Sequence, residues 1–267
     1  MWSIVKGYDN FEIREIRRVD YRDAILIDGF PSIGLVSSIV SNYLIALLRL
    51  EYVGFIDSPY FPAITFIRDS IPMAPARLYA RTDVLPGDQQ LAIFTSEFQP
   101  SQNITKPLGM MMIDWAQQNH CKLIVSVGGL VIERERNEKN ETAAEADQVA
   151  VYGIASTRNA EKYLAEADVE PFVEGVITGT SGMLLREGKK RGFDVVVLLT
   201  EARQNVADAK AAVLLAAAID DMVLKMNLEL DPLLKEAEKL EQKLAVLRRQ
   251  ADSRTKHVPE SGPVGYQ

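Results

Sequence analysis

The chain has 267 residues, of which 47% are hydrophobic and 25% are charged, and its formal net charge is −7. This composition predicts a folded globular protein with one sizeable core and excludes general disorder. A general nucleic-acid binder is disfavoured, because phosphate groups need a clustered basic face and the longest basic run is Lys189-Lys190-Arg191. The single cysteine, Cys121, excludes an intrachain disulfide and a cysteine cluster for zinc.

The first residues give no sign of a targeting segment. Residues 1–6 lack the basic stretch followed by an apolar stretch that a signal peptide combines. No apolar run in the sequence approaches the length of a membrane span. We therefore expect a cytoplasmic protein without a membrane partner.

The first half of the chain is typical of short strands separated by glycine and proline. Residues 24–28 form an apolar run that ends at Gly29, which predicts a buried strand of a parallel or mixed sheet. Apolar residues at helical spacing follow from residue 35 to 47, and strand, glycine turn and helix in this order indicate a βα unit. The other expected elements are strands at 11–16, 52–56, 63–67, 77–80, 91–95 and 123–127, the last of them central, and a helix at 103–119.

The second half begins with a charge-dense segment. Residues 133–147 contain no large apolar side chain, which predicts an exposed loop or lid, a partner contact or plain solvated surface. After it we expect strands at 149–156, 173–178 and 194–200 and helices at 159–167, 183–191 and 208–226. Together these elements predict a three-layer α/β body, in which helices cover both faces of a sheet.

Beyond this body, apolar residues recur at alternating spacings of three and four. They are Leu230, Leu233, Ala237, Leu240, Leu244, Leu247 and Ala251. Asp231 as the N-cap and Pro232 at the first helical position indicate where this helix begins. The spacing predicts a heptad seam, a narrow apolar stripe that must be buried against something. The sequence leaves open whether the stripe pairs between subunits or packs on its own body, and the seam fits dimers, trimers or tetramers.

The last segment predicts a flexible tail, because its few apolar residues cannot pack a core. Tyr266 next to the final carboxylate suits a plug for a pocket elsewhere, although a frayed terminus without a role is the simpler interpretation. We accordingly divide the chain into an α/β body (1–228), a C-terminal helix with the heptad seam (229–252) and a flexible tail (253–267).

Gly179-Thr180-Ser181-Gly182 lies between an expected strand and an expected helix. Backbone N–H groups and the helix dipole at such a place can hold an anion, which makes these residues a possible phosphate loop. The loop lacks the lysine of a nucleotide P-loop and the spacing of a dinucleotide fingerprint, and glycines after strands also serve close packing. The same two interpretations apply to the turns at 29–34 and 128–129.

Catalytic groups are scarce in this sequence. A nucleophile needs a base within hydrogen-bond reach, and the chain has two histidines, His120 and His257. His120 precedes Cys121, but adjacent side chains point in different directions and do not form a pair. No histidine and carboxylate spacing suggests a metal site, and no two carboxylates are evidently paired in a cleft. The sequence thus predicts no catalytic residue, no metal and no cofactor, and it favours a binding protein over an enzyme.

Four motifs stand out in chain order. They are Gly29-Phe30-Pro31-Ser32-Ile33-Gly34-Leu35-Val36, Gly179-Thr180-Ser181-Gly182-Met183-Leu184-Leu185, Ala207-Asp208-Ala209-Lys210-Ala211-Ala212 and Leu230-Asp231-Pro232-Leu233-Leu234-Lys235-Glu236-Ala237-Glu238. Together they resemble the proteasome assembly chaperone family in its archaeal branch, the homologues of proteasome assembly chaperone 2. Each motif alone is weak, whereas the four in this order are specific, and the resemblance spans residues 11–247.

This resemblance implies a body similar to the nucleoside phosphorylase fold without its catalytic residues, homo-oligomers, and ATP-independent action on the proteasome core particle. It also implies docking by a C-terminal motif of a hydrophobic residue, tyrosine and any residue, which enters pockets between α-subunits of the core ring. Tyr266 and Gln267 fit this motif, whereas Gly265 replaces the hydrophobic residue and Val264 lies one position early. Glycine contributes no buried side chain and costs more to order, which disfavours docking, whereas a local bend that shifts Val264 into its place partly compensates. The sequence leaves open which of the two effects prevails.

The leading hypothesis is a cytoplasmic homo-oligomeric chaperone or activator that docks its tail into the α-ring of the archaeal proteasome core. The rival is an enzyme of nucleoside phosphorylase or nucleosidase type, with Gly179 to Gly182 as its phosphate loop. A third hypothesis is a scaffold whose heptad helix pairs with an unrelated partner. Assembly of the core, opening of its gate and delivery of substrates are all compatible with the sequence.

Overall fold

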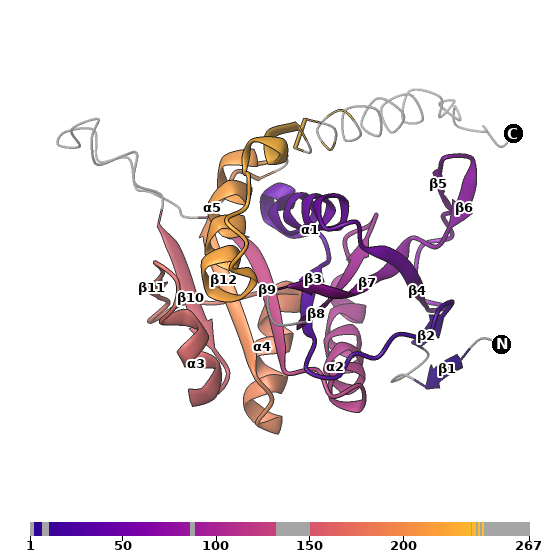
Figure 1. Cartoon of the computed structure of the whole chain (residues 1–267), viewed down its shortest axis with the longest axis horizontal. Coiled ribbons are helices and arrows are strands. Elements are labelled where there is room, and N and C mark those ends of the chain that lie inside the picture. Colours follow the sequence, from indigo (N-terminus) through magenta and orange to yellow (C-terminus); the bar gives the residue numbers. More distant parts are fainter. Residues whose placement is uncertain are drawn as a thin grey trace, which may run out of the picture.

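The computed structural model describes residues 3–6, 11–85, 89–131, 150–204, 206–235, 237, 238, 240 and 242. These residues form a mixed α/β fold in which one large sheet is flanked by helices on both faces (Figure 1). The expected α/β class is therefore confirmed. The predicted exposed segment at 133–147 and the predicted tail at 253–267 lie outside the described residues.

The elements follow the expected order closely. The strands are β1 (Ser3–Lys6), β2 (Glu12–Glu15), β3 (Ile25–Gly29), β4 (Glu51–Asp57), β5 (Phe66–Arg68), β6 (Ile71–Met73), β7 (Ala76–Leu85), β8 (Gln89–Ser96), β9 (Leu123–Leu130), β10 (Val151–Ala155), β11 (Glu170–Pro171) and β12 (Val195–Glu201). The helices are α1 (Val36–Leu47), α2 (Gln102–Gln118), α3 (Arg158–Leu164), α4 (Gly179–Arg191) and α5 (Ala209–Ile219). A 3₁₀ turn, Ile33–Leu35, precedes α1, and a π-helical turn, Asp220–Leu224, extends α5.

The main sheet has ten strands among the described residues, in the order β1-β2-β4-β7-β8-β3-β9-β12-β10-β11. Its centre is parallel: β3 pairs with β8 and β9, and β9 pairs with β12. The other strands are antiparallel to their neighbours except for the short β11, which runs parallel to β10. The predicted strand at 123–127 is thus part of an inner strand, which confirms its central place. A separate two-stranded hairpin of β5 and β6 projects from one end of the sheet (Figure 1).

Two apolar layers cover the faces of the sheet. In β3, Ile25 and Ile27 belong to the cluster that includes α1 and α5, whereas Leu26 belongs to the cluster that includes α2 and α4. Side chains alternate across a strand, so a strand buried on both faces is apolar at most of its positions. The small alanines of α5, such as Ala212 and Ala216, are fully buried and bring this helix close to the sheet and α1.

The prediction of a strand at 173–178 is wrong, because residues 172–178 form a loop between β11 and α4. Val173 and Val176 are 88% and 81% exposed. The edge of β10 pairs with Glu170 and Pro171, and the chain leaves the sheet after these two residues. A β-branched run becomes a strand only where a neighbouring strand offers hydrogen bonds, and this loop has no such neighbour among the described residues.

The strand predicted at 63–67 is displaced toward the C-terminus. Residues 63–65 have no regular structure, and β5 begins at Phe66 to form the hairpin with β6. The closely spaced prolines Pro59 and Pro62 explain the delay, because proline cannot donate a ladder hydrogen bond. None of the helices in the described part of the chain combines the length and the apolar character needed to span a membrane.

Candidate functional site

The four residues of the possible anion loop form the first turn of α4 and not a separate loop before it. Gly179 has a φ angle of +73°, which favours glycine, and a side chain on Gly182 would place its Cβ 2.2 Å from the carbonyl oxygen of Ile177. Both glycines therefore have a conformational or packing reason to be there.

The side chains of this turn meet a carboxylate of the protein itself. Ser126 donates a hydrogen bond of 2.8 Å to Asp28 Oδ2, and the hydroxyls of Ser126 and Ser181 lie 2.8 Å apart. Burial raises the pKa of Asp28 above its usual range, although hydrogen bonds from Thr180, Ser126 and the backbone N–H of Phe30 favour the charged form. The N-terminus of α4, where a phosphate would bind, thus already lies beside the carboxyl group of Asp28. This arrangement weighs against the phosphate-loop interpretation.

Among the described residues, His120 and Cys121 do not form a nucleophilic site, and the other histidine, His257, lies outside the described residues. Cys121 is buried, and burial raises the pKa of its thiol to about 12, so it is a poor nucleophile at neutral pH. His120 occupies a tight turn with a φ angle of +55°, and its backbone links Gln117 to Asp23. The described residues contain no group of three or more histidine, cysteine and carboxylate side chains placed to hold a metal ion.

The predicted turn at 128–129 is wrong, because both glycines lie within β9. These glycines and those at 29–34 serve close packing. A Cβ on Gly34 would lie 2.9 Å from the Cβ of Ala202, and one on Gly129 would lie 2.6 Å from the carbonyl oxygen of Ile33. The backbone N–H of Asp208 donates a 2.8 Å hydrogen bond to the carbonyl of Gly34. The first and third of the four sequence motifs therefore contact each other, at the carboxyl ends of β9 and β12.

Asp208 fixes the start of α5 within this contact. Its carboxylate accepts hydrogen bonds from the backbone N–H and Nε of Arg203, each 3.0 Å, and from the backbone N–H of Ala211 at 3.3 Å. Burial by itself would raise the pKa of Asp208, but the bonds from Arg203 and Ala211 outweigh it and hold the pKa below its usual value. The aspartate is the N-cap of α5, and it also holds Arg203, which precedes the helix, in place.

The start of the C-terminal helix is anchored by a second buried aspartate. Asp220 accepts a 2.8 Å hydrogen bond from the backbone N–H of Met226 with one carboxylate oxygen and another from Leu228 with the other. The hydroxyl of Tyr43 in α1 donates to the carbonyl of Glu229. These bonds fix residues 226–229, which connect the π-helical turn to the C-terminal helix. The C-terminal helix therefore begins at a defined place on the body.

The first residues of the predicted apolar stripe lie against this body. The chain is helical from Asp231, and Leu233, Ala237 and Leu240 are 0%, 3% and 8% exposed and belong to the core cluster of α1 and α5. The neighbouring Leu234 is 48% exposed. Two further predicted stripe residues, Leu244 and Leu247, and the predicted docking residues Val264, Gly265, Tyr266 and Gln267 lie outside the described residues.

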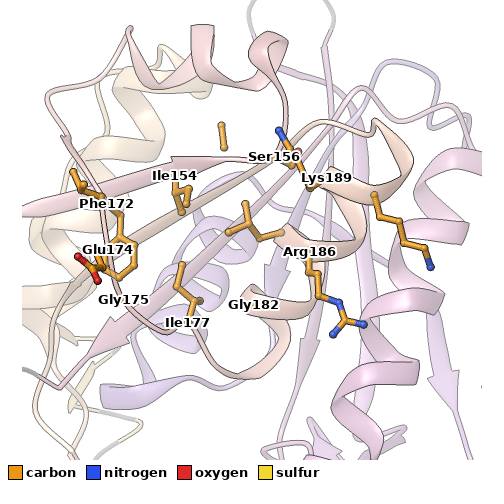
Figure 2. A pocket seen from close by; sticks show the side chains of 13 residues that line it. Ile154, Ser156, Phe172, Glu174, Gly175, Ile177, Gly182, Arg186 and Lys189 are labelled. Carbon is orange, nitrogen blue, oxygen red and sulfur yellow. The ribbon is translucent and has the colours of Figure 1, made fainter.

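A groove that sequence reasoning missed lies between β10 and α4. It has a volume of about 590 Å³, and its apolar lining includes Ile154, Phe172 and Ile177. Figure 2 shows Phe172 and Glu174 on the side of the loop and Arg186 and Lys189 on the side of α4. The signal in the sequence is the pair of valines in this loop, which the predicted strand at 173–178 included.

The described part of the chain is thus an α/β protein with a ten-stranded mixed sheet between helical layers and a C-terminal helix that packs back onto it. The model of the PAC2 family matches residues 26–248. Because this match covers most of the chain, the chain belongs to the PAC2 family.

Individual relatives agree with this assignment. The chain is 30% identical over 244 residues to the uncharacterized protein MJ0106 of Methanocaldococcus jannaschii, which covers 91% of this chain and 92% of that protein. It is similar to the crystal structure of PbaA from Pyrococcus furiosus, an archaeal homolog of proteasome-assembly chaperone. That match has a TM-score of 0.73 and 26% identity and covers 91% of this chain and 99% of PbaA. The resemblance to the archaeal proteasome assembly chaperone family is therefore confirmed.

A second solved structure from the same organism shares the fold. PbaB of Pyrococcus furiosus, an archaeal proteasome activator, matches with a TM-score of 0.69 and 24% identity, over 90% of this chain and 99% of PbaB. At this level of identity the similarity shows a common fold and no more.

Proposed function

We propose that this protein is a homo-oligomeric chaperone or activator that binds the archaeal proteasome core particle without ATP and docks its C-terminal tail into the α-ring. The observation that carries the proposal is the match with PbaA along nearly the whole of both chains. The family model matches residues 26–248, which include the start of the C-terminal helix as well as the sheet, and this extent favours a shared mode of action over a fold reused for another purpose.

The anchored bend gives the tail a defined base. Asp220 and Tyr43 hold the chain where the C-terminal helix begins, and Leu233 packs this helix on the body. In the proposed complex, Tyr266 buries its ring and keeps its hydroxyl hydrogen-bonded, and the final carboxylate pairs with a cation at the floor of the pocket. One such tail binds weakly, and several tails on one oligomer raise the effective concentration of each later contact.

Action by binding alone, with no catalytic residue, is part of the proposal. The acidic Asp28 beside the first turn of α4 and the buried thiol of Cys121 support it. We also propose that the body shares the layout of the nucleoside phosphorylase fold and that the stripe continues as a heptad seam through Leu244 and Leu247. A screen with phosphate and nucleosides tests the enzymatic rival, because a clear rise in melting temperature with these ligands would favour it.

The decisive experiment is hydrolysis of a fluorogenic peptide by purified archaeal proteasome core. The full-length protein is compared with a version that ends at Val264 and with Tyr266→Ala, each with and without ATP. We expect stimulation by the full-length protein in both conditions and its loss in the two variants. Equal behaviour of all three proteins would overturn tail docking, and stimulation that needs ATP would overturn the ATP-independent mechanism.

A further inference from the structure

A second groove, separate from the one at α4, lies where α5 meets the start of the C-terminal helix. It has a volume of about 920 Å³, and residues 168–170, before and within β11, belong to its lining. Its apolar lining includes Val213 and Leu214 of α5 and Leu230 and Leu234 of the C-terminal segment. Apolar side chains that stay partly exposed in a groove indicate an interaction site.

This groove is acidic. Asp168, Glu170 and Asp231 line it with exposed side chains, and Lys210 is the one basic residue of its lining among the described residues. None of these four takes part in an ion pair within the described part of the chain. Three carboxylates thus outnumber one ammonium group, so the groove favours a partner that combines apolar and basic side chains.

The chain itself carries such a segment directly after the described part of its C-terminal helix. Residues 243–256 contain five basic side chains and one acidic side chain, in a protein whose net charge is −7. The basic residues are Lys243, Arg248, Arg249, Arg254 and Lys256, and the acidic residue is Asp252. Leu244, Val246 and Leu247 supply apolar side chains. The segment and the groove therefore have opposite charges, and both have an apolar part.

The C-terminal helix leads away from the groove of its own chain. None of the described residues after Leu234 lines the groove, and Leu233, Ala237 and Leu240 belong to the core cluster of α1 and α5. Figure 1 shows this part of the chain running across α1, away from β10 and β11. A helix advances about 1.5 Å per residue, so a helix that continues from Leu234 to Lys243 carries the basic segment roughly 14 Å beyond the groove. The groove of a neighbouring copy is therefore easier to reach than its own.

We propose that residues 243–256 of one copy of this chain occupy the acidic groove of a second copy. The arginines of the segment then pair with Asp168 and Glu170, and its leucines lie against Val213 and Leu214. Because segment and groove are different surfaces of the same chain, two copies exchange segments in a closed pair or several copies close a ring. Residues 257–267 stay free to reach the proteasome core. This inference rests on the homo-oligomeric part of the proposed function and assigns the residues that hold the oligomer together.

The first test is sedimentation velocity of the full chain, without proteasome core. Asp168→Lys combined with Glu170→Lys reverses the charge of the groove, and we expect it to raise the dissociation constant of the oligomer at least about tenfold. Glu161→Lys combined with Glu174→Lys makes the same change at two exposed residues outside the groove, and this control should keep the wild-type oligomer. A monomeric wild type, a groove variant with an intact oligomer, or equal dissociation of the groove and control variants would contradict the proposal.

Charge exchange between copies separates a specific contact from general disruption. Arg248→Glu combined with Arg249→Glu reverses the charge of the segment, and alone it should dissociate like the groove variant. In an equimolar mixture of the groove and segment variants, each segment meets a groove of opposite charge on the other variant. The mixture should therefore recover most of the wild-type association. Variants that dissociate alone and fail to associate when mixed would rule out a direct contact.

Disulfide crosslinking tests whether the segment comes from a second copy. Glu170→Cys in the groove and Arg249→Cys in the segment are made in separate chains, and the buried Cys121 is left in place. We expect a covalent dimer after mild oxidation only when the two variants are mixed. A covalent dimer of Arg249→Cys alone would mean that the segments of two copies lie against each other. An internal disulfide in a chain with both changes would mean that the segment returns to its own groove, and either result would overturn the proposal.

The failures of the two proposals are distinguishable, because these measurements contain no proteasome core. A chain that stays monomeric and still stimulates the core through its tail would retain tail docking and overturn the groove contact. An oligomer that dissociates in the groove variant, but never stimulates the core, would retain the groove contact and overturn the proposed function.

Discussion

The hydroxyl of Ser126 donates a 2.8 Å hydrogen bond to the buried carboxylate of Asp28, a residue 98 positions earlier in the chain. The contact joins the parallel neighbours β9 and β3 and extends through Ser181 to the first turn of α4. A polar group in an apolar run is tolerated here because its hydrogen bonds are satisfied inside the protein. The cluster therefore supports the junction of two strands and a helix.

The pH dependence of stability should reveal the raised pKa of Asp28. The folded protein keeps the proton of this carboxyl to higher pH than the unfolded chain, so its contribution to the free energy of unfolding falls as pH rises from about 4 through the folded pKa. A difference of one between the folded and the unfolded pKa corresponds to roughly 1.4 kcal/mol. In urea titrations across this range, the unfolding free energy of the wild type relative to Asp28→Asn should therefore fall with rising pH. Parallel curves for the two proteins would contradict the assignment.

Adjacent glycines in β9 should differ in their tolerance of alanine. In Gly129→Ala the new Cβ meets the carbonyl oxygen of Ile33 at 2.6 Å and the Cβ of Ala202 at 2.7 Å, neither of which can move alone. We expect a loss of about 2–3 kcal/mol in the free energy of unfolding. Gly128→Ala is the matched control, because its nearest contact is the flexible side chain of Leu199 at 3.1 Å, and it should lose less than about 1 kcal/mol. Equal losses would show that packing at Ile33 is not the reason for Gly129.

The sequence predicted the regular elements well because burial leaves a local trace. Strands covered on both faces, such as 123–127 and 194–200, are mostly apolar runs whatever lies around them. The polar cluster left no such trace, since the partners of Asp28 come from two distant segments. The prediction at 173–178 failed for the opposite reason: its valines have strand propensity, and only the tertiary structure shows that the chain leaves the edge of β10 after Pro171.

The C-terminal helix offers a second matched pair. Leu233→Ala removes a fully buried side chain from the core cluster, and we expect a loss of about 2–4 kcal/mol in the free energy of unfolding. Leu234→Ala truncates the next residue, which is 48% exposed, and should change stability by no more than about 0.5 kcal/mol. Urea denaturation of the two variants at several protein concentrations checks this. A loss for Leu233→Ala that appears only in the oligomer would mean that the stripe packs between subunits and not on its own body.

The proposed docking motif can also be strengthened instead of removed. Gly265→Leu restores a hydrophobic residue before Tyr266, adds buried apolar surface and removes the extra flexibility of glycine. The two effects together favour docking by about 2 kcal/mol for each tail, which corresponds to roughly a thirtyfold change in affinity. The concentration for half-maximal stimulation of the proteasome core should therefore fall. Gly262→Leu makes the same change outside the last three residues and should leave that concentration unchanged. An equal gain in both variants would indicate nonspecific hydrophobic binding of the tail.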